Sequence, residues 1–360
     1  MIPVTKPYLP DREKLARYID GIYERGWLTN NGPLVQKLTS RLEEYLGVKN
    51  LLLVSNGTLA LQIAYRALGI SGTQQKAEAI TTPFTFVATA SSLKWEGIEP
   101  IFADIDADTW CLDPANIEGA ITPQTKAIVP VHVFGSACNV EAIEQIAKKH
   151  NLKIVYDASH AFGVKYKSES LLKHGDAATL SFHATKLFHT IEGGAIIFKR
   201  KESLERAKKM INFGLTGSEA IDALGINAKM NEFQAAMGLC VLDEIQVNLQ
   251  ARSDIWNTYE QALSNKFQLQ ARPKELEQNY SYFPVALKNK DSTKLTLEKL
   301  KEKNIQARRY FYPSLETTEF FQNRNNQTVS RSIAERILCL PLHHQINKED
   351  QDLIIELLYS

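Results

Sequence analysis

Short apolar runs alternate with stretches of helical periodicity over the first two thirds of the 360-residue chain, and this pattern constrains the fold most strongly. The runs are nearly continuously apolar, which is typical of strands buried on both faces. Amphipathic helices lie between several of them, one beginning near Gly57 and another over residues 140–150. The alternation predicts an α/β fold with a mostly parallel, seven-stranded sheet. The predicted strands are residues 51–54, 79–81, 100–103, 127–131, 153–156, 179–182 and 195–198.

The pattern changes after about Gly238, where a long helical stretch is followed by shorter elements. No linker rich in Gly or Ser separates the two parts. We therefore predict a large α/β domain over residues 1–240 and a smaller α+β domain over residues 241–360, joined by a long helix. The predicted elements of the second part are helices at 243–263, 293–303 and 348–358 and strands at 282–285 and 338–341.

Composition and charge disfavour several classes of protein. The formal net charge of +1 gives no electrostatic reason to expect binding to nucleic acid or to an anionic membrane. The N-terminus lacks the apolar core of a signal peptide, and no apolar run approaches the ~20 residues of a membrane span. The four cysteines lie far apart without metal-ligand spacing, so we expect buried free thiols, no metal site and a cytoplasmic protein.

Polar signals follow several predicted strands, at the sheet edge where open α/β folds bind ligands. Ser-Asn-Gly-Thr at residues 55–58 joins a strand to a helix, whose positive N-terminus suits a phosphate. No Gly-Lys-Ser/Thr follows it and no G-x-G-x-x-G motif occurs, which disfavours a Walker A loop or a dinucleotide site. The alternative is a plain helix cap without a ligand.

Three further signals lie at other strand ends. Asp157 ends an apolar strand, so its carboxylate would face the site, although it could equally be a helix cap. Lys186 lies in a partly apolar turn, where desolvation lowers the pKa of an amine and lets it attack a carbonyl, although most lysines are solvated surface charges. Phe86, in an aromatic-rich turn, could stack on a planar ring or simply belong to the core.

Together these signals fit one cofactor, pyridoxal 5'-phosphate (PLP), better than any of them does alone. The chain offers a phosphate cup, an aromatic face, an acid for the ring nitrogen and an amine for a Schiff base, in that order. The acid is needed because the protonated ring is the electron sink. The residues therefore predict a PLP enzyme of the aminotransferase kind, with Lys186 carrying the cofactor.

The sequence also resembles the DegT–StrS family of nucleotide-sugar aminotransferases over nearly its whole length. The resemblance implies the aspartate-aminotransferase fold, PLP fold type I, and a homodimer with shared active sites. Its motifs are TNNGP (29–33), SNGT (55–58), PFTFVAT (83–89), FADID (102–106), VHVFG (131–135), DASHA (157–161), SFHATK (181–186), GINAKM (225–230) and RRYFYP (308–313).

The resemblance assigns a role to individual residues. It makes Lys186 the Schiff-base lysine and acid/base, and it pairs Asp157 with the pyridinium. It places His160, where the family often has Gln, beside the ring hydroxyl. The remaining residues are Gly57, Thr58 and Ser181 for the phosphate, Asn227 for the partner subunit's phosphate, Phe86 for the ring face, and Thr29, Asn30, Arg309 and Tyr310 for the sugar nucleotide.

Two departures from the family pattern bear on the phosphate and partner contacts. Asn56 stands in place of a small residue in the phosphate loop, and Lys229 stands where Arg is usual. We expect Asn56 to alter one amide contact of the phosphate loop. We expect Lys229 to lose a bidentate contact, because a lysine cannot make the two parallel hydrogen bonds of an arginine.

The resemblance also implies a two-step reaction. L-glutamate gives its amine to the cofactor, which then aminates a nucleotide-linked keto sugar, and the form of the lysine motif favours C4 of dTDP-4-keto-6-deoxy-D-glucose, as in O-antigen synthesis. Amination at C3 of a 3-keto sugar, and UDP- or GDP-linked substrates, stay open. A PLP-dependent sugar dehydratase and a non-catalytic regulator are alternatives that an intact Lys186 disfavours.

Overall fold

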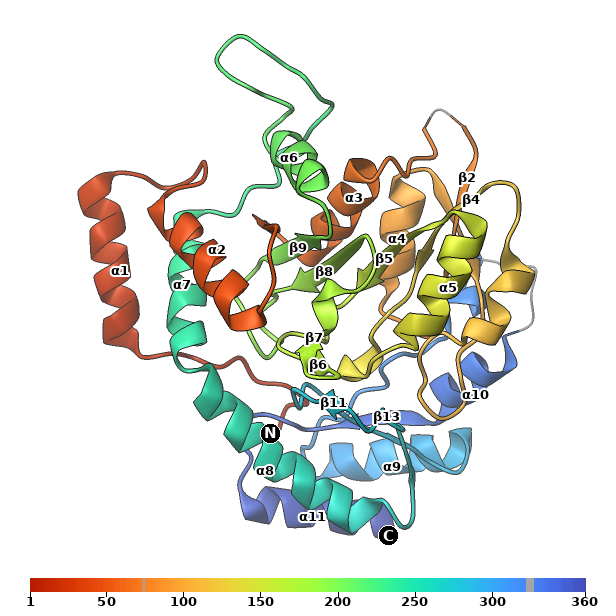
Figure 1. Cartoon of the computed structure of the whole chain (residues 1–360). Coiled ribbons are helices and arrows are strands. Elements are labelled where there is room, and N and C mark those ends of the chain that lie inside the picture. The colour runs from red at the N-terminus through yellow and green to blue at the C-terminus, as the bar shows by residue number, and fades with distance from the viewer. Residues whose placement is uncertain (74, 322–326) are drawn as a thin grey trace.

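A seven-stranded sheet forms the centre of the molecule (Figure 1), in a computed structural model that describes residues 1–73, 75–321 and 327–360. Its strands run parallel except β9, which is antiparallel to both of its neighbours. The predicted mostly parallel seven-stranded sheet is therefore confirmed. In sheet order the strands are β1 (Leu51–Val54), β9 (Gly194–Phe198), β8 (Ala177–Ser181), β5 (Lys153–Asp157), β4 (Thr125–Val129), β2 (Ala77–Thr81) and β3 (Ile98–Phe102).

Both faces of this sheet are buried in apolar clusters. Successive strand residues point to opposite faces, so neighbouring residues of one strand belong to different clusters. Leu51 and Leu53 of β1 belong to one apolar cluster, whereas Leu52 and Val54 belong to another. Helices cover each face and contribute their apolar stripes to the cluster on that side. The first cluster includes side chains of α2 (Pro33–Leu46), α5 (Val140–His150) and α7 (Glu232–Asp243), and the second includes side chains of α3 (Gly57–Ala67), α4 (Val87–Trp95) and α6 (Lys201–Met210).

Several strands differ from their predicted limits because hydrogen bonding continues past the apolar run. β5 includes Asp157, whose backbone pairs with Thr179 of β8. β8 begins at Ala177, paired with Phe198, two residues before the predicted start. Small or charged residues give little apolar signal, but the ladder extends over them when both neighbouring strands are present.

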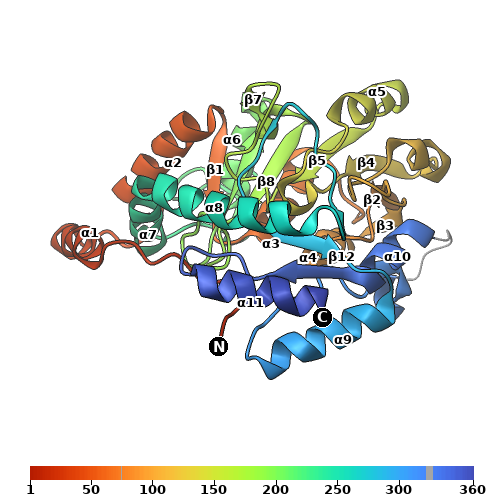
Figure 2. The same ribbon diagram turned by 90° about the horizontal axis from the view of Figure 1, so that it is seen from below.

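The C-terminal part contains an antiparallel sheet covered by helices, with an apolar cluster of its own. α8 (Ile245–Leu263) leads into it from α7. Figure 2, a view from below, shows α8 and α11 lying across this region. The division into residues 1–240 and 241–360 stays a prediction. The sheet holds β10 (Gln268–Leu269), β12 (Phe283–Ala286) and β13 (Ile337–Leu340), with α9 (Lys290–Glu302) and α11 (Lys348–Tyr359) beside it.

α9 begins three residues before its predicted start because of its cap. The Asn289 side chain accepts a hydrogen bond from the Ser292 amide, and the Ser292 hydroxyl accepts one from the Asn289 amide. These two bonds form a capping box. The first helical residues after Asn289 are charged, so the apolar periodicity of the sequence did not indicate that the helix begins there.

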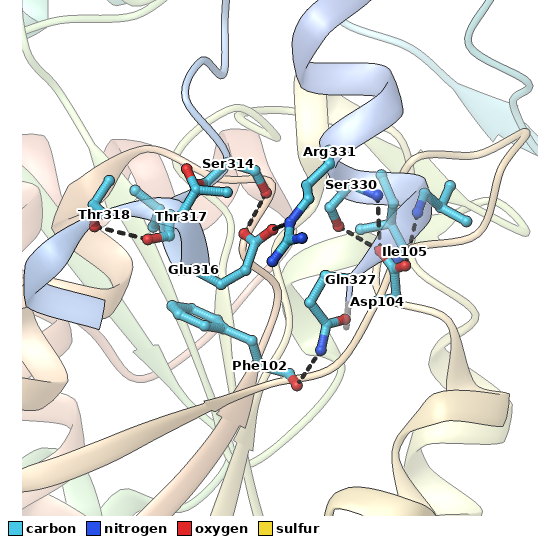
Figure 3. A network of polar contacts seen from close by, with 12 residues as sticks. Phe102, Asp104, Ile105, Ser314, Glu316, Thr317, Thr318, Gln327, Ser330 and Arg331 are labelled. Atoms are coloured by element: carbon cyan, nitrogen blue, oxygen red, sulfur yellow. Dashed lines mark hydrogen bonds and ion pairs between the residues drawn. The ribbon is translucent and has the colours of Figure 1, made fainter. Parts of the chain in front are cut away.

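A polar network ties the C-terminal part to the carboxyl end of β3 (Figure 3). The Asp104 carboxylate accepts hydrogen bonds from the Val329 and Ser330 amides, at the N-terminus of α10 (Thr328–Arg336). A carboxylate stabilises that end of a helix because the helix dipole is positive there. Gln327 donates to the Phe102 carbonyl, and buried Glu316 pairs with Arg331.

Further short elements complete the fold. A small sheet joins β11 (Leu276–Glu277), β6 (Lys165–Tyr166) and β7 (Glu169–Ser170), so the C-terminal part also pairs with the loop after β5. Among the described residues, no helix combines the length and apolarity that crossing a membrane requires. The other helices are α1 (Arg12–Arg25) and the 3₁₀ turns Pro114–Asn116, Glu118–Ala120, Val133–Gly135, Leu171–Lys173, Leu315–Thr317 and Glu319–Phe321.

Candidate active site

A cavity of about 300 Å³ lies at the carboxyl ends of the parallel strands. Asp157 and Ser181, the last residues of β5 and β8, contribute to its wall. The sheet therefore gathers side chains that are far apart in the sequence. Those of the predicted site residues that line the cavity are Gly57, Thr58, Phe86, Asp157, His160, Ser181, Lys186 and Tyr310.

Asp157 is a buried carboxylate with both oxygens held in place. The Thr89 hydroxyl donates to its Oδ2 at 2.7 Å, and the Ser159 hydroxyl and amide donate to its Oδ1 at 2.6 and 3.1 Å. The side chain is only 5% exposed, so rotation would break hydrogen bonds that water could not replace. Its orientation toward the cavity is thereby fixed.

Lys186 follows β8 in a turn closed by a hydrogen bond from its own amide to the His183 carbonyl. Burial lowers the pKa of its amine to about 8, and the negative charge of Asp157 opposes this effect. A substantial fraction of the amine is then neutral near neutral pH, unlike that of a solvated lysine. Its Nζ lies 3.4 Å from the Tyr282 hydroxyl, so the amine has a polar partner inside the cavity.

His160 is a buried imidazole whose proton is assigned by its surroundings. Its Nδ1 accepts a hydrogen bond from the Phe134 amide at 3.2 Å, so in the neutral ring Nε2 carries the hydrogen. Burial, together with the charge of Lys186, holds the pKa of His160 well below its usual range. The residue is thus a neutral hydrogen-bond donor rather than a charge that changes with pH.

The N-terminus of α3 lies beside the end of β8 at the cavity, where helix amides without an acceptor could bind an anion. Asn56 caps the helix by accepting from the Leu59 amide, so its side chain is engaged in the cap. Gly57 and Thr58 are the first two residues of the helix, and their N–H groups have no acceptor within it. A Cβ at Gly57 would lie 2.8 Å from the Ser181 Cβ, so only glycine permits this approach.

Aromatic residues form the remaining walls. Phe86 is the N-cap of α4 and keeps 53% of its surface exposed, which leaves its ring accessible in the cavity. Tyr310 and Phe311 also line the cavity, and they come from the C-terminal part. The ring of Tyr282 packs against His160 with centroids 4.7 Å apart.

Four predicted site residues do not line the cavity of this chain: Thr29, Asn30, Asn227 and Arg309. Thr29 and Asn30 are exposed in the turn before α2. That turn packs on α7, where the Glu232 carboxylate accepts from the Leu34 amide. Asn227 is also exposed, at the base of the loop between α6 and α7 that reaches away from the sheet in Figure 1.

Arg309 also lies away from the cavity, and its neighbour Arg308 lines it instead. The Arg309 guanidinium donates to the Ala334 and Glu335 carbonyls at the end of α10 and stacks on Tyr312. It therefore stabilises the C-terminus of a helix, where a cation is favourable.

Lys229 binds within its own chain. Its Nζ donates to the Asn212 side chain at 2.9 Å and lies 4.9 Å from the Phe213 ring centroid. One amine therefore makes one hydrogen bond and one cation–π contact there.

Sequence reasoning missed Tyr282, Arg308 and Phe311 as individual cavity residues. Tyr282 stands 96 positions after Lys186 and starts a predicted strand, so no spacing links the two. Arg308 and Phe311 belong to the RRYFYP stretch, which was already marked as lying near the substrate. The presence of Tyr310 in that stretch was the signal that could have extended the prediction to both.

Comparison with known proteins identifies the family. The model of the DegT/DnrJ/EryC1/StrS aminotransferase family matches residues 10–359. A dTDP-4-amino-4,6-dideoxy-D-glucose transaminase from Shigella dysenteriae is 42% identical over 359 residues, 98% of this chain and 96% of the relative.

Solved structures agree in fold. DesI, crystallised in the presence of its TDP-sugar product, superposes with a TM-score of 0.92 at 32% identity, covering 99% of this chain and 92% of DesI. The PLP-form of the putative sugar aminotransferase Spr1654 from Streptococcus pneumoniae gives 0.92 at 26% identity, with 99% and 97% covered. The predicted fold class is confirmed, and the chain belongs to the DegT/DnrJ/EryC1/StrS aminotransferase family.

Proposed function

We propose that this protein is a PLP-dependent transaminase that moves the amino group of L-glutamate to C4 of dTDP-4-keto-6-deoxy-D-glucose. The observation that carries the proposal is the convergence of the Lys186 amine, the Asp157 carboxylate and the Gly57 anion site in one cavity. The name of the Shigella relative supports the sugar and the nucleotide. The amino sugar would serve the synthesis of a surface polysaccharide such as O-antigen.

The residues present fit PLP. The α3 N-terminus with Ser181 suits a phosphate, because helix amides and a hydroxyl can donate to it. Asp157 is a buried acid with room on the cavity side for a protonated ring nitrogen. When bound, PLP supplies an electron sink for the negative charge that develops at the carbon next to nitrogen.

Lys186 performs two tasks in this scheme. Its amine has a pKa of about 8, so about half of it is neutral at that pH, and this fraction can attack a carbonyl without first losing a proton to water. With PLP bound, the amino donor would displace the Lys186 amine, which could then accept a proton from one of the two carbons bonded to the transferred nitrogen and return it to the other. A pKa close to the working pH suits a group that must both accept and donate a proton.

Asp157 and His160 set the electrostatics around the ring. Asp157, oriented by Thr89 and Ser159, favours a positive charge opposite its carboxylate. His160 offers its Nε2 hydrogen to an oxygen on the ring and stays neutral while doing so. The departure from Gln at this position thus keeps a neutral donor.

We further propose a homodimer that shares its active sites. Thr29, Asn30 and Asn227 are polar, exposed and outside their own cavity, as residues that serve a partner's site would be. The loop between α6 and α7 supports this assembly, because exposed apolar side chains gather on it. They are Phe213, Leu215, Ile221, Leu224 and Ile226.

The activity is tested with purified protein, L-glutamate and a panel of keto sugars. We expect a yellow protein that bleaches with L-glutamate, and a 4-amino product from the dTDP-linked 4-keto sugar, identified by mass spectrometry and NMR. Amination of a 3-keto, UDP- or GDP-linked sugar in preference would correct the substrate. No amino product from any member of the panel would refute the transaminase.

The shared site is tested by mixing inactive subunits. Lys186→Ala and Asn227→Ala subunits should recover activity on mixing, because one of the two sites in the mixed dimer then has both residues. The control mixture, Lys186→Ala with Asp157→Ala, should recover none, since each change inactivates the cavity of the subunit that carries it. Equal results from the two mixtures would contradict the assignment of Asn227.

A further inference from the structure

α8 carries a buried cation without an anionic partner. Arg252 is 1% exposed, and no carboxylate of the described part of the chain forms an ion pair with it. Its guanidinium instead donates to three neutral oxygens: Asn248 Oδ1 at 3.2 Å, the Ser281 carbonyl at 3.4 Å and the Leu342 carbonyl at 3.2 Å. Burial lowers the pKa of Arg252 to about 10, so the group is still charged at neutral pH.

Asn248, one turn earlier on α8, is oriented by this cation. Because its amide oxygen faces the guanidinium, its NH₂ group faces the other way, and it donates to the Leu187 carbonyl at 3.1 Å. The side chain is also 1% exposed, so no water competes for either bond. Arg252 and Asn248 together hold three backbone carbonyls in fixed positions, and two of them are those of Leu187 and Ser281.

These two carbonyls belong to the neighbours of the residues that meet in the cavity. Leu187 follows Lys186, and Ser281 precedes Tyr282. The Lys186 Nζ and Tyr282 hydroxyl are 3.4 Å apart although 96 positions separate them in the chain. α8 is thus the element whose side chains fix both backbones.

A second set of bonds fixes the same segment to the other side of the site. Asn279 donates to the His160 and Phe162 carbonyls at 2.9 Å, and the Ser281 hydroxyl donates to the His160 carbonyl at 3.2 Å. Tyr282 is therefore held relative to His160 by one set of bonds. It is held relative to Lys186 by the bonds of α8.

We propose that Asn248 and Arg252 are positioning residues for Lys186, which act by holding it beside the Tyr282 hydroxyl. This inference rests on the proposed function. Burying a charge without an anionic partner costs free energy of desolvation, so stability alone is a weak reason for a cation at this place. Precise placement of a proton-transferring amine is a sufficient reason, because a misplacement of about 1 Å can cost about 10²-fold in rate.

Two substitutions remove the proposed contacts singly. Asn248→Asp keeps the acceptor for Arg252 but replaces the donor to the Leu187 carbonyl with an oxygen. Tyr282→Phe removes only the hydroxyl beside Lys186. The control is Gln351→Glu, which removes a buried amide donor to the Ile255 carbonyl, also on α8 but away from the cavity.

Each variant is assayed for kcat and KM with L-glutamate, for Tm, and for the pH at which the visible absorbance of the bound cofactor changes. We expect each of Asn248→Asp and Tyr282→Phe to lower kcat about tenfold with KM unchanged. The double variant should lose about as much as one single variant, whereas independent effects would multiply to about a hundredfold. The absorbance midpoint should move in the same direction in both variants and stay in place in Gln351→Glu.

The pH midpoint of the absorbance change depends on Lys186 and on the other charged or titratable groups around it. Those lining the cavity with it are Asp157, His160, His183, Glu192, Tyr282, Arg308 and Tyr310.

Multiplicative losses, or a lowered Tm in Asn248→Asp with kcat and the absorbance midpoint unchanged, would overturn the proposal and leave a purely structural role. If Asn248→Asp gives no folded protein, Asn248→Ser takes its place in the same cycle. Failure of the proposed function has a different signature, because the unmodified protein would then neither turn yellow with PLP nor bleach with L-glutamate.

Discussion

The two walls of the cavity are built in different ways. On one wall, Asp157 and Ser181 end strands of the central sheet, Gly57 begins the helix that follows β1, and Lys186 follows five residues after β8 ends. On the other wall, Tyr282, Arg308, Tyr310 and Phe311 come from the C-terminal part. The first wall follows from the order of strands, whereas the second depends on how a distant segment packs onto them.

That packing rests on contacts of long sequence separation. The Leu315 amide donates to the Pro83 carbonyl, and Phe311 packs edge-to-face on Phe84 with centroids 5.7 Å apart. Asp104 holds the start of α10 at the end of β3. We therefore expect substitutions on the strand-end wall to reduce kcat and substitution of Arg308 on the C-terminal wall to raise KM. Tyr282 is the exception on that wall, because its hydroxyl lies beside Lys186 and its loss should reduce kcat.

The largest effect is expected for Lys186→Ala. Without the amine, both the attack on the carbonyl and the proton transfers are lost, so kcat should fall by at least about 10³-fold. The measurement is amino-sugar formation with L-glutamate, and circular dichroism checks that the fold is kept. A Lys186→Ala protein with near-normal turnover would refute the mechanism on this wall.

Asp157→Asn should have the next largest effect. The amide keeps the shape of the side chain but loses its negative charge, so kcat should fall by about 10²–10³-fold. Thr89→Val, which removes one donor and keeps the carboxylate, serves as the graded control and should cost about tenfold less. If both variants lose the same factor, orientation rather than charge is what Asp157 provides.

Adjacent arginines give a direct test of the C-terminal wall. Arg308→Gln should raise KM for the sugar nucleotide about tenfold, because a charge-assisted bond to a diphosphate is lost at the cavity. Arg309→Gln should leave KM unchanged and lower Tm, because its guanidinium binds the end of α10. The opposite pattern in steady-state kinetics and thermal unfolding would restore the sequence-based assignment of Arg309.

The sequence predicted one wall well because local patterns determine it. An apolar strand followed by Asp157 places that residue at the sheet edge, and a glycine at a helix start marks the anion site. The roles of Arg308 and Arg309 could not be separated, because adjacent side chains differ only in which tertiary neighbour they meet. Tyr282 could not be paired with Lys186, because that contact requires the packing of α8.

The charge state of His160 could not be predicted without the structure. Imidazole titrates near neutral pH when solvated, so an exposed ring at this position would change charge in the working range. Burial and the nearby lysine hold the pKa of His160 well below that range. The partner that assigns its tautomer, the Phe134 amide, comes from another loop, where Phe134 adopts a positive φ of 54°.

The smallest expected effect concerns the pH dependence of cofactor capture by the protein freed of PLP. Only the neutral amine attacks, and burial lowers the pKa of Lys186 to about 8. The capture rate should rise about fivefold from pH 7 to 8 and less than about twofold from 8 to 9, whereas a lysine at its ordinary pKa would gain about tenfold at each step. The free energy of unfolding should also rise with pH, from about pH 8 toward the ordinary pKa that Lys186 has in the unfolded chain. It rises because Lys186 binds its proton more tightly in the unfolded state than in the folded one. The rate is followed by the growth of visible absorbance, and a continued tenfold rise above pH 8 would mean that the cavity does not desolvate the amine.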